Sequence, residues 1–151
     1  TNSALSLTSI ALSETPTAVH TYAIASAAQG ELRSHGFFFQ ASGTGGGTLG
    51  LPIRRRGNAI DSYLKESAEV LFLRIAADLR ISPIDSLRGT AVTKSTSEDG
   101  CTNSCVDWYG NTRPIFLGDR ILALIGYELV EGADRGDRVE EIRRTSFAPV
   151  R

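Results

Sequence analysis

The sequence predicts an all-β protein built from antiparallel four-stranded meanders, on the strength of three observations. Residues 19–26 alternate with a period of two and are rich in β-branched and aromatic side chains, which is typical of a strand. Two apolar runs are separated by Gly118 and Asp119 alone, which is a two-residue hairpin signature. No segment carries the long amphipathic pattern of helices that an α/β fold would need.

Length, composition and charge limit the classes of protein that this chain can belong to. Its 151 residues suit one domain, and 41% hydrophobic with 22% charged residues is ordinary for a globular protein. Sixteen basic and seventeen acidic residues leave a net charge of -1, so no bulk attraction to nucleic acid or anionic membrane is expected. No apolar run approaches the ~20 residues of a membrane-spanning helix. No nucleic-acid partner, membrane span, metal or cofactor is predicted.

The cysteines and the missing methionine bear on processing and compartment. The chain begins at Thr1 and contains no Met, so we expect a processed or excised chain. Cys101 and Cys105 lie in a polar, turn-forming stretch, and a curled loop can bring two such Cα atoms within the ~7 Å of a disulfide. Two free thiols, or a metal or redox site, remain alternatives. A disulfide would predict a secreted or periplasmic protein.

The N-terminal third is expected to contain three strands. An early strand is expected at residues 5–12, where Leu5 and Leu7 share one side. Residues 19–26 form the second strand, residues 27–30 a turn, and residues 31–42 a third strand. The second and third strands are expected to pair as a hairpin.

The middle of the chain begins with a glycine-rich stretch. Residues 43–50 predict a flexible loop, because glycine costs most entropy to order. A short strand is expected at 49–53. Residues 60–67 are ambiguous and could begin a short helix capped by Asp61 or Ser62. Strands at 68–75 and 78–83 are expected to form a hairpin, and residues 86–103 an exposed loop.

The C-terminal region has the clearest pattern. Strands are expected at 113–117 and 120–125, with a third at 126–131 and a turn at 132–137. Residues 138–147 are polar and charged, as suits an outer edge strand that must avoid unwanted pairing. These strands make a four-stranded antiparallel unit.

The meander pattern recurs along the chain. Residues 68–89 and 113–130 each contain the dipeptide Phe-Leu in a predicted hairpin, shortly before its turn. Repetition of such a meander at about 45 residues is typical of propeller blades. We therefore predict one β domain over 1–151 or a partial propeller. Its approximate units are 1–57, 58–100 and 101–151. A β-sandwich or barrel is the alternative.

One stretch also resembles a known family. The string from Gly100 through Cys105, Asp107, Trp108 and Tyr109 to Asn111, then residues 113–117, 126–131 and the tail 146–149, resembles the C-terminal blades of secreted bacterial β-propeller-domain proteins. The likeness covers about a third of the chain and extends loosely to 68–72 and 22–39. Its motifs are structural rather than catalytic. Since a propeller needs ~4–8 blades, the resemblance implies that further blades come from the same protein, other chains or further copies.

Two motifs lie near the glycine-rich stretch. Residues 45–50 match G-x-G-x-x-G, but Pro52 and three arginines follow where a helix would have to begin, so we interpret them as a loop. The triplet Arg54, Arg55 and Arg56 could bind a phosphate or sulfated sugar, or could simply end a strand in solvent.

The remaining candidates leave three functions open. His35, with His20, could serve as a base or ligand, or could be an exposed strand histidine. Asp107, Trp108 and Tyr109 could form a carbohydrate platform, or the Trp could pack in a blade core. No catalytic residue is assigned. The leading hypothesis is a non-catalytic binding or assembly module. The alternatives are a hydrolytic subunit acting on polysaccharide or peptide through Asp107 and His35, and a carbohydrate-binding β-sandwich.

Overall fold

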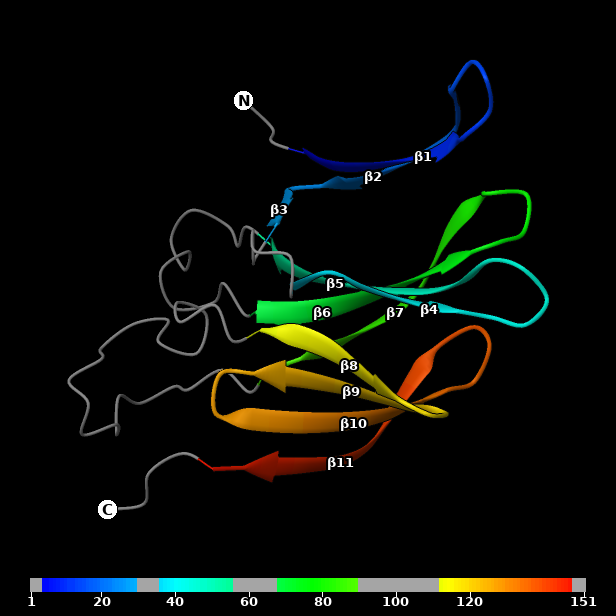
Figure 1. The fold of residues 1–151 in the computed structure, drawn as a ribbon. Helices are drawn as coiled ribbons and strands as arrows, with labels where there is room; N and C mark the ends of the chain where they lie inside the picture. The colour runs from blue at the N-terminus through cyan, green and yellow to red at the C-terminus, as the bar shows by residue number, and fades with distance from the viewer. Residues whose placement is uncertain (1–3, 30–35, 56–67, 90–111, 148–151) are drawn as a thin grey trace.

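A computed structural model describes residues 4–29, 36–55, 68–89 and 112–147, and this part of the chain is all-β, as predicted. Its strands form three open antiparallel sheets (Figure 1). The N-terminal sheet contains β1 (Ala4–Ala11) and β2 (Thr17–Ala25). The middle sheet contains β3 (Ala27–Gln29), β4 (Phe38–Ala41), β5 (Gly47–Arg55), β6 (Ala68–Ile75) and β7 (Ile81–Arg88). The C-terminal sheet contains β8 (Arg113–Leu117), β9 (Arg120–Ile125), β10 (Glu128–Asp134) and β11 (Val139–Ser146).

The middle sheet is a meander with four successive strand positions, as the C-terminal sheet is. Both β3 and β4 pair with β5: Gln29 lies opposite Ile53, and Phe38 lies opposite Gly50. They are therefore two pieces of one edge strand, separated by residues 30–37. From that edge the order runs through β5 and β6 to β7, as it runs from β8 through β9 and β10 to β11.

Each sheet ends in a hairpin that carries a β-bulge at a corresponding position. The register of β1 with β2, of β6 with β7 and of β10 with β11 shifts once, and the other strand pairs of the described residues show no shift. In each case the extra residue is on the second strand and is β-branched: Val19, Ile84 and Ile142. Since bulges are specific features of a strand pair, the three hairpins are structural copies.

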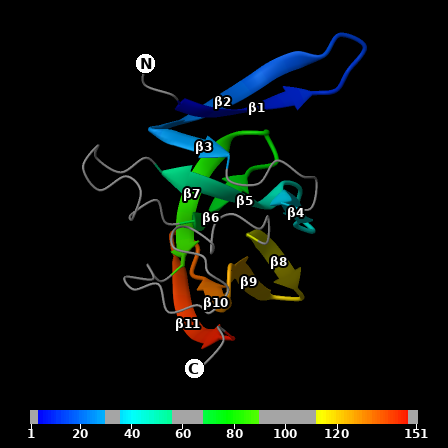
Figure 2. The same ribbon diagram turned by 90° about the vertical axis from the view of Figure 1, so that its left-hand side faces the viewer.

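The sheets are stacked, and the core lies between them. Figure 2 shows β7 above β11 on one side of the stack and β4 above β8 on the other, and both pairs are in contact. Val70 and Phe72 point from β6 toward the C-terminal sheet, while Leu71 and Leu73 point toward the N-terminal hairpin. Because both faces of the middle sheet are covered, the centre of β6, residues 70–73, is a continuous apolar run rather than an alternating one.

Several expected elements are confirmed. The hairpin of β8 and β9 turns at Gly118 and Asp119, and residues 68–75 form β6 as predicted. The last strand, β11, is the outer edge of its sheet. Its neighbour β10 runs on through Gly132 to Asp134, so the turn comes later than expected, at Arg135–Arg138. Strand β7 likewise begins at Ile81 and continues to Arg88, which shortens the predicted loop at 86–103.

The predicted N-terminal hairpin is wrong. Strand β2 pairs with β1, and residues 27–29 form β3 instead of a turn. The backbone of Ser26 has φ 54, in the left-handed region, and this single residue takes the chain from the N-terminal sheet into the middle sheet. Residues 31–35 and 60–67 lie outside the described residues.

Glycines that suggested a loop belong partly to a buried strand. Residues 47–50 are the first part of β5 and are buried. Gly47 lies against Gln40 and Phe39, and Gly50 lies against Pro114 of the next sheet. A side chain would not fit at either place, so these glycines permit close approach of strands and sheets. The two hairpins that contain Phe-Leu, β6–β7 and β8–β9, do not occupy equivalent positions. Strands β6 and β7 are the last two of their sheet, whereas β8 and β9 are the first two of theirs.

Candidate functional site: the junctions between sheets

Of the residues singled out from the sequence, only His20 takes part in the contacts between sheets, as the acceptor of the Ile81 N–H. Arg54 is exposed on β5, and Arg55 is the last residue of that strand. The other candidates lie outside the described residues: His35, Arg56, Asp107, Trp108, Tyr109 and the predicted disulfide partners Cys101 and Cys105. Two groups of polar contacts join one stacked sheet to the next.

The first junction joins the N-terminal hairpin to the turn of the next hairpin. Nδ1 of His20 on β2 accepts a hydrogen bond of 3.2 Å from the backbone N–H of Ile81. Ser9, opposite His20 on β1, donates its hydroxyl to the carbonyl oxygen of Leu79 at 2.7 Å. Leu79 has φ 66, so the turn of β6 and β7 holds its carbonyl in an unusual backbone conformation. The N-terminal hairpin thus supplies one acceptor, His20, and one donor, Ser9, and both bind backbone groups of the next hairpin.

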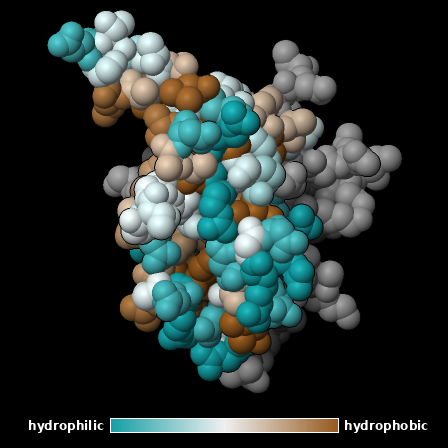
Figure 3. Space-filling model, turned by 90° about the vertical axis from the view of Figure 1, so that its right-hand side faces the viewer, coloured by the Kyte–Doolittle hydropathy of each residue, from teal (hydrophilic) through white to brown (hydrophobic). Residues whose placement is uncertain are grey.

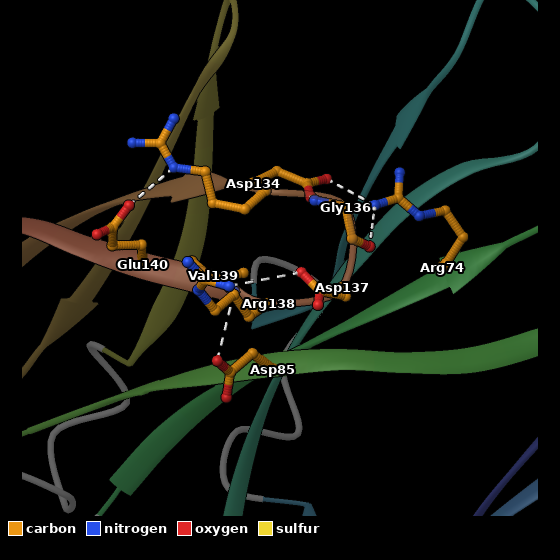
Figure 4. Close-up of polar contacts among 9 residues, drawn as sticks. Arg74, Asp85, Asp134, Gly136, Asp137, Arg138, Val139 and Glu140 are labelled. Carbon is orange, nitrogen blue, oxygen red and sulfur yellow. Dashed lines mark hydrogen bonds and ion pairs between the residues drawn. The ribbon is translucent and has the colours of Figure 1, made fainter.

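The second junction joins the middle sheet to the C-terminal hairpin (Figure 4). Oδ2 of Asp85 on β7 accepts from the backbone N–H of Val139 at 3.3 Å, and its Oδ1 accepts from the N–H of Ser86 at 2.8 Å. Arg74 on β6 donates to Asp134 at 2.8 Å and to the carbonyl oxygen of Gly136 at 3.4 Å. The turn of β10 and β11 is therefore held by side chains of the preceding hairpin.

One hydrogen bond occurs at corresponding positions in the two junctions. His20 follows the bulge residue Val19, and Asp85 follows the bulge residue Ile84. Their donors Ile81 and Val139 are the first residues of β7 and β11. Both junctions therefore use a side-chain acceptor after the bulge and a backbone N–H at the start of the next outer strand. Sequence reasoning missed this link, because its only local signal is a β-branched residue followed by His or Asp.

The corresponding position in the last hairpin has a different chemistry. Arg143 follows the bulge residue Ile142, and a guanidinium can donate but not accept hydrogen bonds. Arg143 pairs with Glu131 at 2.9 Å, and Arg120 pairs with the same carboxylate at 2.6 Å. The hydrogen bond from Arg120, followed by that from Arg143, lowers the pKa of Glu131 from its ordinary 4.5 to about 2. The far face of the C-terminal sheet thus carries a charged cluster in place of the junction acceptor.

This cluster gives a prediction about acid stability. A carboxyl whose pKa is lowered in the folded state contributes stability above its ordinary pKa, and loses that contribution as the pH falls through the folded value. For Glu131 the loss is expected between pH 4.5 and about 2. The melting temperature of Glu131→Gln should therefore fall less steeply than that of the original chain over this range. Asp137→Asn, at the exposed turn, is the matched control and should keep the original profile; parallel profiles for Glu131→Gln would contradict the prediction.

A third polar contact lies beside the second junction. Glu69 on β6 is 1% exposed, and its Oε2 accepts from Arg88 at 2.9 Å and from Ser86 at 3.1 Å. Arg144 of β11 donates to the carbonyl oxygen of Arg88 at 2.8 Å and pairs with Glu128 at 2.7 Å. This chain of contacts ties the outer strands of the middle and C-terminal sheets together.

The first junction can be tested by changing its acceptor. His20→Ala removes the acceptor of the Ile81 N–H, and Ile81 is buried, so we expect a loss of ~1–3 kcal/mol in the stability of the hairpin's docking. Backbone amides of β1 and β2 should then exchange with solvent faster, while those of β9 and β10 keep their protection. Hydrogen–deuterium exchange measures this directly.

Two variants control this experiment. His20→Gln offers a side-chain oxygen as acceptor and should restore part of the protection. Thr21→Ala removes only the exposed hydroxyl pair with Thr8 and should change stability by less than ~0.5 kcal/mol. Unchanged exchange in His20→Ala, or an equal effect of Thr21→Ala, would show that the His20 link does not hold the hairpin.

Comparisons with known proteins identify no relative. Neither the protein-family models, the curated proteins nor the solved structures contain a significant match to this chain. Within the described residues, no group of three or more His, Cys, Asp or Glu side chains is placed to hold a metal ion. Among the same residues, no helix has the length and apolarity to cross a membrane.

Proposed function

We propose that this chain is a non-catalytic assembly module whose sheets stack like the blades of a propeller in a secreted or periplasmic protein. One observation carries the proposal: the junction of His20 with Ile81 recurs in the junction of Asp85 with Val139. A link that repeats from sheet to sheet is a means of adding sheets to a stack. Its residues differ while its geometry is kept, which suggests that stacking itself is what these positions serve.

The state of the polar groups also favours a structural role. His20 and Asp85 are side chains of the kind that serve as catalytic bases and acids, and each accepts a backbone N–H from the neighbouring sheet. A neutral imidazole has one accepting nitrogen, so His20 would have to release the Ile81 N–H before that nitrogen could take a proton from a substrate. The buried carboxylate of Glu69 is likewise engaged by Arg88 and Ser86. The described polar side chains therefore support assembly better than catalysis.

The partners follow from the geometry of a propeller. Such a ring closes with ~4–8 blades, and the described residues form one four-stranded sheet, one five-stranded sheet whose edge is shared by β3 and β4, and one hairpin. The remaining blades would come from the same protein, from other chains or from further copies. The family resemblance of residues 100–149 points the same way.

The native mass tests the proposal. The protein is purified from its source, measured by light scattering during size-exclusion chromatography, and every species in the peak is identified by denaturing mass spectrometry. We expect the sequence to elute within a larger polypeptide or a stable complex. A 16.2 kDa monomer with one cooperative melt would overturn the proposal, because the stack would then be complete by itself.

A further inference from the structure

One edge of β1 has no hydrogen-bonded strand in the described part of the chain. Strand β1 pairs with β2 along its other edge over its whole length, from Ala4 to Ala11. An open edge presents a row of unpaired backbone N–H and C=O groups, because residues of a strand direct these groups alternately to the two sides. The hairpin extends from the body of the molecule (Figures 1 and 3), and β1 is its terminal strand in the sheet order.

The other two copies of this hairpin show what belongs at that edge. When the three hairpins are aligned on their bulges, Ser9 corresponds to Phe72 and to Glu131. Phe72 pairs on its second side with Gly50 of β5, and Glu131 pairs with Leu122 of β9. Strands β6 and β10 are thus internal strands. Beyond β6 lie β5 and then β3 and β4, and beyond β10 lie β9 and then β8. By this correspondence β1 occupies the position that an internal strand holds in the other two sheets, and no strand pairs with its second edge within the described residues.

The sequence of β1 fits an internal strand better than a free edge. Its eight residues, ALSLTSIA, include no charge and no proline. The true outer strand β11, VEEIRRTS, carries four charged side chains: Glu140, Glu141, Arg143 and Arg144. Charges and prolines are the usual means by which exposed edges avoid pairing. The open edge of β1 lacks these protections, so its chemistry permits strand addition.

We propose that the open edge of β1 accepts a two-stranded antiparallel hairpin of the β8–β9 kind, supplied by a partner polypeptide, which completes the N-terminal sheet to four strands. This assignment rests on the proposed stacking function. The correspondence of hairpins also sets the register. Position 124 of a β9-like strand would lie opposite Leu7, and position 122 would lie opposite Ser9.

The side chains of the incoming strand follow from that register. Leu7 and Ser9 face the middle sheet: Leu7 packs against the core cluster there, and Ser9 bonds to Leu79. Residues directly opposite each other on paired strands point to the same face. The partner's side chains opposite Leu7 and Ser9 would therefore also face the middle sheet and should be apolar, as Leu122 and Leu124 are. Alternating apolar residues in the partner hairpin are thus required for specificity, while backbone bonds provide the pairing.

The probe is a synthetic hairpin with the sequence of residues 112–127, added to the 151-residue chain and followed by hydrogen–deuterium exchange. We expect alternate amides of β1 to exchange at least about tenfold more slowly when the probe is bound, with no change along β11. The matched control is the same probe with Leu122→Asp and Leu124→Asp, which keeps the turn but loses the apolar face. It should give no protection.

A second version of the experiment joins the probe covalently to the chain, so that weak binding of a free peptide cannot hide the interaction. In an extended chain, a copy of residues 112–127 directly precedes Ser6, as these residues precede Glu128 in the C-terminal sheet. The extension should protect β1 in the same register, and its doubly substituted version should not. Absence of protection in both versions would overturn the proposal. So would protection of β1 in the unextended protein that rises with concentration as its mass doubles, since the occupant would then be a second copy.

Failure of this assignment is distinguishable from failure of the stacking function. If β1 stays unprotected while the native mass is that of a larger assembly, only the edge assignment falls. A native monomer of 16.2 kDa would remove the proposed function whatever the probe does.

Discussion

Replacing Phe72 by alanine is expected to lower the free energy of unfolding by ~3–5 kcal/mol, the largest effect of a single truncation that the described core suggests. The side chain is 0% exposed and lies in the core cluster between the middle and C-terminal sheets. Its ring meets Phe116 edge-on with 6.1 Å between centroids, so truncation removes apolar burial and an aromatic contact and leaves a cavity at the junction. Urea denaturation monitored by circular dichroism measures the loss.

Phe38→Ala is the matched control for Phe72→Ala. Phe38 also touches Phe116, with ring centroids 5.9 Å apart, but it is 50% exposed. Since half of its surface is already in water, its truncation should cost less than ~1 kcal/mol. Equal losses for the two variants would mean that the layer between the sheets is not the principal core of this part of the molecule.

Gly50→Val is expected to destabilise the protein by ~3 kcal/mol through overpacking. A Cβ on Gly50 would overlap the ring of Pro114 in the C-terminal sheet and lie 3.4 Å from Cε1 of Phe72. The backbone of Gly50 is not in the left-handed region, so the cost comes from the close approach of the sheets and not from strain in the strand. Amides of β8 and β9 should lose protection before those of β6 and β7.

Two comparisons make the Gly50 experiment decisive. Gly43→Ala adds a Cβ where no atom lies within 4 Å, and it should be nearly neutral. Adding Pro114→Gly to Gly50→Val removes the atoms that collide, so the double variant should lose less stability than the sum of the two single variants. Additive losses would contradict the close packing of Gly50 on Pro114.

The sequence predicted local pairings well where the turn residues are distinctive. Gly118 and Asp119 define the hairpin of β8 and β9 because a two-residue turn fixes the register of its strands. The apolar run of β6 identified that strand, since such a run fits a strand covered on both faces. Charged residues on β11 indicated an outer edge, and the sheet order agrees.

The same reasoning failed where the environment changes the meaning of a residue. Glycine has a low strand propensity, so residues 47–50 suggested a loop, yet the nearby Pro114 and Gln40 require glycine within β5. Ser26 carries no sequence signal for the change of sheet that follows it. The candidate site was missed for a related reason: His20 and Ile81 are sixty-one positions apart, and only the stacking of sheets brings them within hydrogen-bond distance.

The sequence by itself determined the all-β class, most strand positions and the tightest hairpins, because alternation and turn chemistry act between residues that are close along the chain. Only the tertiary structure decided which strands share a sheet, how the sheets stack and which polar side chains link them. Those choices depend on burial of both faces of β6 and on backbone groups that must find partners across a junction. Such contacts join residues that no local pattern connects, and the link that follows two of the three bulges is therefore visible only in the folded chain.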